Sequence, residues 1–260
     1  MRLLTIILCF ITLPSVGQLK ADFKGNSLAT DQFGYYYEVG DTEIKKYTVS
    51  GELYRTYSNN VLGVIASIDV SNPYKVVVYF RDFTKILILD NFLTPNSEVI
   101  DLTENDLDQT TLVCRSYNNG IWYYDPVRFE LTRKNPELIT TNNSGNLANL
   151  LGKNIQPNFI VEYNNELYLN DETNGILVFD LYGTYLKTIP IYGLSTFQVK
   201  DKYLIYANSQ KQVETYDFFT LEKKQYKPEV YKDVRFVQVQ NGSIFIVDEN
   251  NALRIDKIEK

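Results

Sequence analysis

The chain has 260 residues, a formal net charge of −6, 14% aromatic residues and no histidine. An acidic chain without a basic stretch repels phosphate backbones, so we expect no nucleic-acid partner. The lack of histidine excludes serine and cysteine triads of the usual kind and typical zinc sites. Any metal would be a hard cation such as calcium, held by oxygen ligands.

Residues 1–17 have the pattern of a removable signal peptide. Arg2 is the charged start, residues 3–13 are apolar, and the Ser-Val-Gly of residues 15–17 is a small-x-small cleavage signal. The apolar run is too short to span a bilayer. We therefore predict export to the periplasm or a periplasm-facing envelope complex, with no integral membrane segment after cleavage. An uncleaved anchor is the alternative.

Cleavage after residue 17 would remove Cys9 and leave Cys114 as the single cysteine of the mature chain. No intrachain disulfide can then form. Cys114 lies in an apolar segment, where a thiol packs like a small hydrophobic side chain. With no histidine available as its base, we do not expect it to act as a nucleophile.

A strand pattern recurs along the rest of the chain at intervals of about 40 residues, the size of a four-stranded propeller blade. The second strands of these units begin near Tyr35, Val76, Ile121, Leu167, Tyr203 and Ile244. We predict an all-β fold, a single six-bladed β-propeller domain over residues 18–260 with four-stranded antiparallel blades. The last blade lacks a fourth strand, and the alternating residues 19–24 are expected to supply it and close the ring.

The clearest repeat lies in residues 164–189. Two short apolar runs there end in turn clusters, the first containing Asn174-Gly175 and the second containing Gly183. The string L-Y-x-x-D-x-x-N-x-I-x-V-F-D-x-x-G-x-x-L, residues 167–186, resembles the NHL-type repeat of six-bladed propellers. The resemblance covers about one blade closely and implies the same propeller fold for the chain.

Polar side chains end the first strands of five predicted blades. They are Asp69, Arg115, Glu162, Lys200 and Gln240. Because first strands surround the central channel, we expect these residues to ring one channel mouth. The alternative is that they are polar only because the end of a strand beside a turn is exposed to solvent.

Two connections between blades, residues 101–109 and 141–157, are longer than the repeat requires and should project from the same face. The first gathers four carboxylates, Asp101, Glu104, Asp106 and Asp108. Calcium binding is one interpretation, although the order differs from that of an EF-hand loop. A solvated acidic loop is the other.

The second long connection follows a fourth strand expected at residues 137–141 and contains a predicted helical turn at residues 146–152. Leu147, Leu150 and Leu151 fall on one face of that turn, which Gly152 ends. This apolar face either packs back on the blade or contacts a partner.

No catalytic motif is present, so the leading hypothesis is a noncatalytic exported propeller without a cofactor, an interaction or scaffold module that binds another envelope protein. One alternative is a calcium-dependent hydrolase resembling the lactonase-like six-bladed propellers, whose Glu, Asn and Asp metal ligands imply a role for Glu162. Another alternative is glycan or small-ligand binding on the aromatic rings of Trp122, Tyr123 and Tyr124. The competing interpretation is that these three side chains pack between blades.

Overall fold

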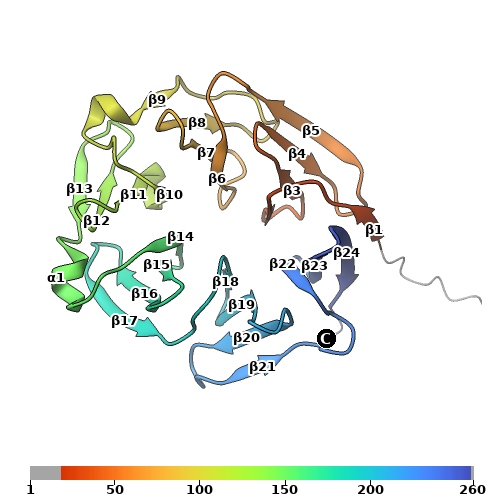
Figure 1. Ribbon diagram of the computed structural model, residues 1–260. Coiled ribbons are helices and arrows are strands. Elements are labelled where there is room, and N and C mark those ends of the chain that lie inside the picture. Colours follow the sequence, from red (N-terminus) through yellow and green to blue (C-terminus); the bar gives the residue numbers. More distant parts are fainter. Residues whose placement is uncertain (1–18, 259–260) are drawn as a thin grey trace, which may run out of the picture.

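A computed structural model of the protein describes residues 19–258, which form six antiparallel sheets of four strands each. Figure 1 shows the sheets arranged as blades around a common centre, so the predicted six-bladed β-propeller is confirmed. The predicted signal peptide, residues 1–17, lies outside the described residues. Within residues 19–258 no helix is long and apolar enough to cross a membrane.

In blades 1 to 5 the four strands follow one another in the chain. The first strand lies nearest the centre of the disc and the fourth lies at the rim. Blade 1 comprises β2 (Ser27–Thr30), β3 (Tyr36–Val39), β4 (Glu43–Tyr47) and β5 (Leu53–Ser58). Blade 2 comprises β6 (Ile65–Asp69), β7 (Val76–Phe80), β8 (Lys85–Leu89) and β9 (Ile100–Asp101). Blade 3 comprises β10 (Leu112–Arg115), β11 (Ile121–Asp125), β12 (Glu130–Lys134) and β13 (Thr140–Asn143).

Blade 4 comprises β14 (Pro157–Tyr163), β15 (Glu166–Asp171), β16 (Gly175–Asp180) and β17 (Tyr185–Ile189). Blade 5 comprises β18 (Gln198–Lys200), β19 (Tyr203–Ala207), β20 (Val213–Asp217) and β21 (Lys223–Gln225). Blade 6 is built from β22 (Val234–Gln240), β23 (Ser243–Asp248), β24 (Ala252–Lys257) and β1 (Leu19–Asp22). The helices within residues 19–258 are η1 (Leu102–Asn105), η2 (Tyr117–Asn119) and α1 (Leu147–Leu151).

The core lies between the blades, because alternate residues of a strand point to opposite faces of its sheet. In β7, Val76, Val78 and Phe80 pack against blade 1, whereas Val77 and Tyr79 pack against blade 3. Both faces of the strand are therefore buried, which explains its continuous apolar sequence. Among the described residues, six such clusters each join two neighbouring blades.

Strand β1 closes the ring, as predicted from residues 19–24. It pairs antiparallel with β24, with Lys20 opposite Arg254, and covers the outer edge of the last blade. The next residue, Phe23, is 1% exposed and packs in the cluster between blades 6 and 1. The chain then approaches blade 1 so closely at Gly25 that a Cβ there would lie 2.9 Å from the Val39 amide nitrogen.

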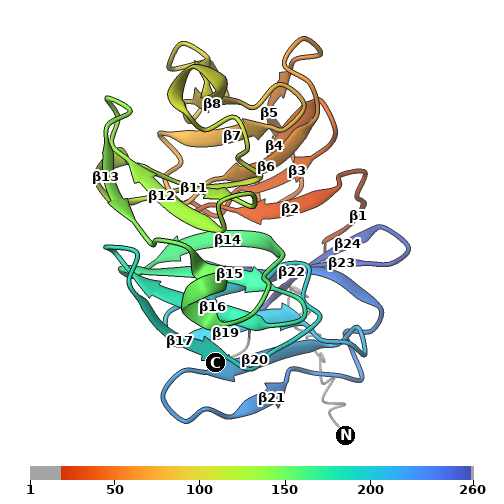
Figure 2. The same ribbon diagram turned by 60° about the vertical axis from the view of Figure 1, so that its left-hand side comes forward.

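The predicted helical turn is confirmed as α1, which lies between blades 3 and 4 in Figure 1 and in front of blade 4 in the view of Figure 2. The expected fourth strand of blade 3 begins three residues late, at Thr140 instead of residue 137. Asn135 causes the delay, because its backbone carbonyl accepts the Leu138 N–H and its side chain accepts the Ile139 N–H at 2.9 Å. The residues before Ile139 therefore form a turn.

The ring closure gives the first prediction. Phe23→Ala should lower the free energy of unfolding by about 3–5 kcal/mol, because it leaves a cavity where the ends of the chain meet. Leu53→Ala, at an exposed strand position, is the control and should change stability by no more than about 0.5 kcal/mol. Urea unfolding followed by tyrosine fluorescence measures both. Equal stability of the two variants would contradict a closed ring.

Candidate functional site

The strand order gives the disc two different faces. One, here called the turn face, carries the turns between the first and second and between the third and fourth strands of each blade. The other, the connection face, carries the connections between blades and the turns between second and third strands. The two long connections therefore share the connection face, as expected, on either side of blade 3.

On the turn face, large aromatic side chains are exposed by one kind of turn that recurs in several blades. In five of its turns an Asp or Asn side chain accepts the backbone N–H two residues later, which fixes the turn, and that later residue is an exposed aromatic. The accepting residues are Asp31, Asn72, Asp90, Asp180 and Asp217, at 2.8 to 3.0 Å. The displayed residues are Phe33, Tyr74, Phe92, Tyr182 and Phe219, each 45% to 81% exposed.

Three of these displayed aromatics belong to one patch over blades 1 and 2. The aromatic patch comprises Phe33, Tyr35, Tyr54, Arg55, Tyr74 and Phe92. Ring centroids of Phe33 and Tyr74 lie 5.6 Å apart, and those of Tyr54 and Phe92 lie 6.3 Å apart. The Arg55 guanidinium lies over both Tyr54 and Phe92, at 4.4 and 5.2 Å from the centroids. The patch thus joins apolar rings to one exposed cation.

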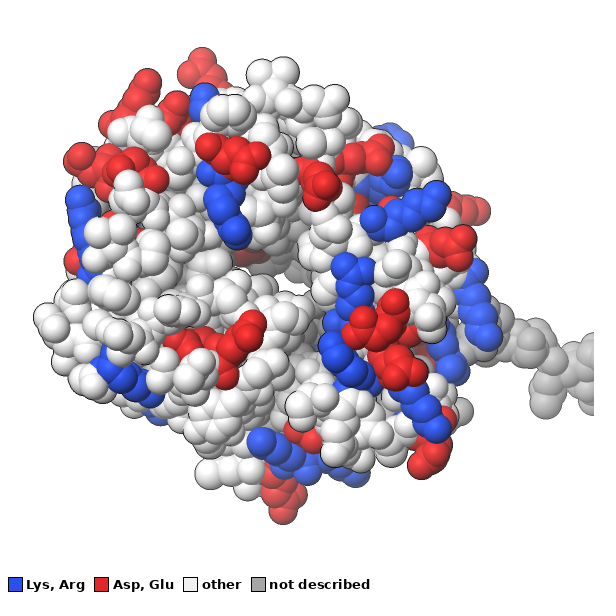
Figure 3. All heavy atoms as spheres, viewed as in Figure 1, with Lys and Arg blue, Asp and Glu red and all other residues white. Residues whose placement is uncertain are grey.

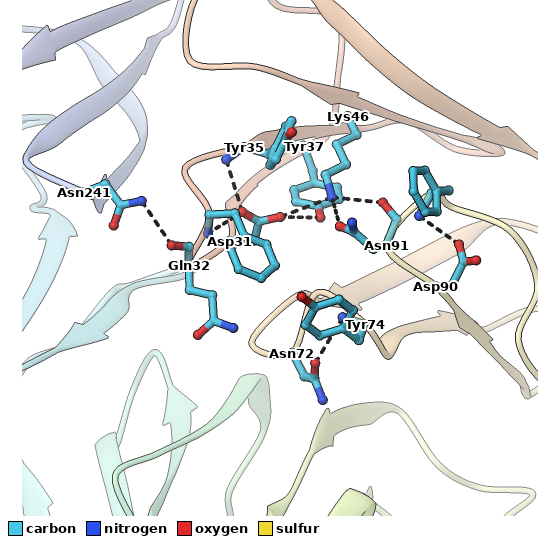
Figure 4. A network of polar contacts seen from close by, with 12 residues as sticks. Asp31, Gln32, Tyr35, Tyr37, Lys46, Asn72, Tyr74, Asp90, Asn91 and Asn241 are labelled. Carbon is cyan, nitrogen blue, oxygen red and sulfur yellow. Dashed lines mark hydrogen bonds and ion pairs between the residues drawn. The ribbon is translucent and has the colours of Figure 1, made fainter.

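A buried ion pair lies beneath the aromatic patch. Lys46 Nζ is 3.3 Å from Asp31 Oδ2, and neither side chain is exposed to solvent. The same carboxylate oxygen accepts the Tyr37 hydroxyl at 2.8 Å, and the ammonium donates to the Asn91 side chain of blade 2, also at 2.8 Å (Figure 4). The ammonium also lies 4.4 Å from the centroid of Tyr35. Blade 1 is therefore fastened to blade 2 directly under the exposed rings.

Burial sets the protonation behaviour of this network. It lowers the pKa of Lys46, and the Asp31 carboxylate opposes that shift. Burial raises the pKa of Tyr37 above its ordinary value, and the hydrogen bond to Asp31 raises it further. At neutral pH the phenol therefore remains a hydrogen-bond donor.

The five polar residues predicted at the channel mouth mostly line the channel and join neighbouring blades. The central channel has a volume of about 600 Å³, and Asp69, Glu162, Lys200 and Gln240 line it. Asp69 Oδ2 accepts the backbone N–H of Arg115 at 2.8 Å, and Lys200 Nζ donates to Gln240 at 2.6 Å. These polar groups therefore hold blades together. Figure 3 shows the channel as a hollow in the centre of the disc.

Glu162 and the three aromatics of β11 belong to one interblade contact. Glu162 accepts the Trp122 indole N–H at 2.8 Å. Trp122, Tyr123 and Tyr124 are at most 1% exposed, and their rings pack against the neighbouring blades. Cys114 is buried opposite Trp122, and burial raises the pKa of its thiol. The ring faces in β11 are therefore not open to a stacking sugar.

The acidic residues of the first long connection occupy structural positions. Asp101 caps η1 by accepting the Thr103 N–H at 3.0 Å, and its other carboxylate oxygen lies 3.4 Å from Lys85. Hydrogen bonds from Thr103 and the neighbouring ammonium lower the pKa of Asp101. Asp106 ends η1 in a left-handed conformation. No group of three or more Cys, Asp or Glu side chains within residues 19–258 is placed to hold a metal ion.

The apolar face of α1 is partly buried in the core and partly exposed to solvent. Leu147 is completely buried and Leu151 packs against the same cluster between blades 3 and 4. Leu150 is 56% exposed. Of these three predicted partner-binding leucines, Leu150 alone is substantially accessible, because α1 lies against the blades.

The fold and these faces define the class of protein: the chain is a six-bladed β-propeller. No protein-family model matches it, and no curated protein matches its sequence. Among solved structures it is similar to streptogramin B lyase, with a TM-score of 0.59 and 13% identity over 94% of this chain and 88% of that one. It is also similar to the computationally designed Ika8 protein, with a TM-score of 0.51 and 10% identity over 89% of this chain and 70% of that one. At these identities the likeness extends to the fold alone.

The buried pair gives the second prediction. Asp31→Asn should lower the free energy of unfolding by about 3–5 kcal/mol, because it leaves the Lys46 ammonium buried without its counter-ion. The double variant Asp31→Asn with Lys46→Met should recover part of that loss.

Glu43→Gln in the same blade is the matched control. It breaks the exposed pair between Lys45 and Glu43, which are 2.7 Å apart, and should cost less than about 1 kcal/mol. Chemical denaturation at neutral pH measures all of these variants. A cost for Asp31→Asn as small as that for Glu43→Gln would show that the buried pair does not hold the two blades together.

Proposed function

We propose that this protein is a noncatalytic, exported binding module that holds another envelope protein on its turn face, over blades 1 and 2. The observation that carries the proposal is the aromatic patch. Exposed aromatic rings grouped on one face are typical of protein interaction sites, in which aromatic residues and arginine are enriched.

The patch is preorganised, which supports a binding role. Its aromatic side chains sit on turns fixed by Asp31, Asn72 and Asp90, and the buried pair holds the blades below them in place. Binding to such a surface requires little ordering of backbone, so more of the contact energy appears as affinity. An apolar segment of the partner fits the rings, and Arg55 supplies one charged contact at their edge.

The chemistry of the chain favours binding over catalysis. With no histidine, it lacks the commonest general base. Polar groups that line the channel are bonded across blades, as Lys200 is to Gln240 and Glu162 is to the Trp122 indole. The signal-peptide pattern of residues 1–17 and the fold together favour a role as an accessory component of an envelope assembly.

The third prediction tests the patch. The triple variant Phe33→Ser, Tyr74→Ser, Phe92→Ser should lower affinity for the partner at least about 100-fold, since loss of aromatic anchors typically costs 2 kcal/mol or more each. Affinity purification from envelope extracts, with quantitative mass spectrometry, identifies the partner. Interferometry with that purified partner then gives the affinity.

The matched control is Tyr182→Ser with Phe219→Ser. These rings are displayed by the same kind of turn on the same face, but over blades 4 and 5. The control should recover the same partner as the unmodified protein. Equal recovery by the triple variant, or no partner enriched by the unmodified protein, would count against the proposal.

A further inference from the structure

The Lys46 side chain ends between a carboxylate and a carboxamide (Figure 4). Its Nζ lies 3.3 Å from Asp31 Oδ2. The same nitrogen donates twice to Asn91, to the side-chain Oδ1 at 2.8 Å and to the backbone carbonyl at 3.1 Å. Since a C=O bond is about 1.2 Å long, the carboxamide carbon of Asn91 lies within about 4 Å of the amine nitrogen. An amine, an amide carbon and a carboxylate are therefore held in one place.

The end of the Lys46 side chain is enclosed and dry. Neither this side chain nor the carboxylate beside it has exposed surface. The rings of Tyr35, Tyr37 and Tyr54 surround the nitrogen, with centroids 4.4, 5.2 and 5.7 Å from it. Asn91, in the turn after β8, is half-buried, so the enclosure reaches the surface on that side. Water is thus kept from the amine, while a small product can leave past Asn91.

Burial favours an uncharged amine at this position. It lowers the pKa of Lys46, against the opposing effect of Asp31. Transfer of a proton from the ammonium to Asp31 Oδ2 makes both groups neutral, and a dry site tolerates neutral groups better than ions. A desolvated lysine amine is a nucleophile. Asp31 keeps its position during the transfer, because its other oxygen, Oδ1, accepts the backbone N–H groups of Phe33 and Tyr35 at 2.9 and 3.1 Å.

We propose that Lys46 and Asn91 join through a covalent amide bond, formed by the folded protein itself with Asp31 as the proton-transfer group. Asp31 Oδ2 takes a proton from the Lys46 ammonium, and the freed amine attacks the carboxamide carbon of Asn91. The bond from that carbon to the side-chain nitrogen of Asn91 then breaks. The departing nitrogen takes one proton from the attacking amine and one from Asp31. A lysine ammonium and a carboxamide thus give a secondary amide and an ammonium ion, with the Asp31 carboxylate restored.

The geometry supplies two accelerations to a reaction that is otherwise very slow. Well-oriented groups in one molecule reach effective molarities of about 10⁵–10⁸ M, and a positioned acid–base group adds a factor of about 10²–10⁴. Both accelerations require the fold, because Lys46 is in blade 1 and Asn91 follows β8 of blade 2. We therefore expect the bond to form after folding and without another enzyme.

This bond has the effect that a disulfide has in other proteins. Cys114 is the single cysteine within residues 19–258, and it is free. An amide between Lys46 and Asn91 closes a loop of about 45 residues and restricts the unfolded chain as a disulfide does. It also ties the turn that displays Phe92 to blade 1. The inference concerns the covalent structure of the chain and is independent of the proposed binding function.

Mass spectrometry of the folded protein without substitutions, here called the parent protein, tests the proposal. Its mass should be lower than the sequence requires by one ammonia, about 17 Da. Digestion with trypsin should yield one branched peptide, residues 46–55 joined to residues 86–115 through Lys46 and Asn91. Succinimide formation at another asparagine removes the same mass, so the branched peptide is the deciding observation.

Three variants and a matched control test the residues. Lys46→Arg and Asn91→Ala each remove one reacting group and should give no branched peptide. Asp31→Asn keeps both reacting groups but cannot take the proton, and it should lower the yield of branched peptide at least about tenfold. Lys45→Arg removes the neighbouring amine, which pairs with Glu43 at the surface, and should give the same yield as the parent protein. Circular dichroism before digestion shows which variants are folded.

Absence of the branched peptide from the folded parent protein after prolonged incubation would overturn the proposal, whether or not the variants fold. An equal yield from folded Asp31→Asn would overturn the role of Asp31 in the reaction. Neither result would bear on the aromatic patch as a binding site, because the partner-binding experiment uses other variants and measures affinity.

Discussion

The rest of the structure depends on the closure of the ring by β1. Each blade buries both faces of its sheet against two neighbours, so a ring with a gap would expose two faces and one sheet edge to solvent. Pairing of β1 with β24, and burial of Phe23 in the cluster between blades 6 and 1, prevent that exposure. Since blade 1 carries much of the aromatic patch and borders this closure, the geometry of the patch depends on it as well.

The two faces of the disc carry different surface features. On the turn face, short turns fixed by Asp and Asn side chains hold aromatic rings out to solvent, and the buried pair of Lys46 and Asp31 fastens blade 1 to blade 2 below them. On the connection face, the long connections border a cavity that is lined by apolar residues and one cation, Arg81. The aromatic patch and this cavity therefore lie on opposite faces of the disc.

The architecture could be predicted because its signals are local. Alternating apolar residues, turn clusters and the repeat of about 40 residues each act over short stretches, and the missing sixth outer strand required residues 19–24. The helical turn around Leu147 was predicted for the same reason. The delayed start of β13 at Thr140 depends on the side chain of Asn135, which competes with the strand for backbone N–H groups.

The sites were harder to predict because their residues meet only across blades. Lys46, which pairs with Asp31 in blade 1, reaches Asn91 only because blade 2 packs on blade 1. The Asp-x-Phe and Asn-x-Tyr spacings at residues 31–33 and 72–74 were visible in the sequence. They indicate turns, but the exposure and the grouping of the rings follow from the folded ring.

Site-specific photo-crosslinking in the cell that makes the protein can show whether a partner binds the aromatic patch. A photoreactive phenylalanine analogue is placed at Tyr74 in one variant and at Tyr182 in another, and adducts are resolved by mass spectrometry. We expect one defined protein adduct from position 74 and none to that protein from position 182. The same adduct from both positions, or none from position 74, would contradict it.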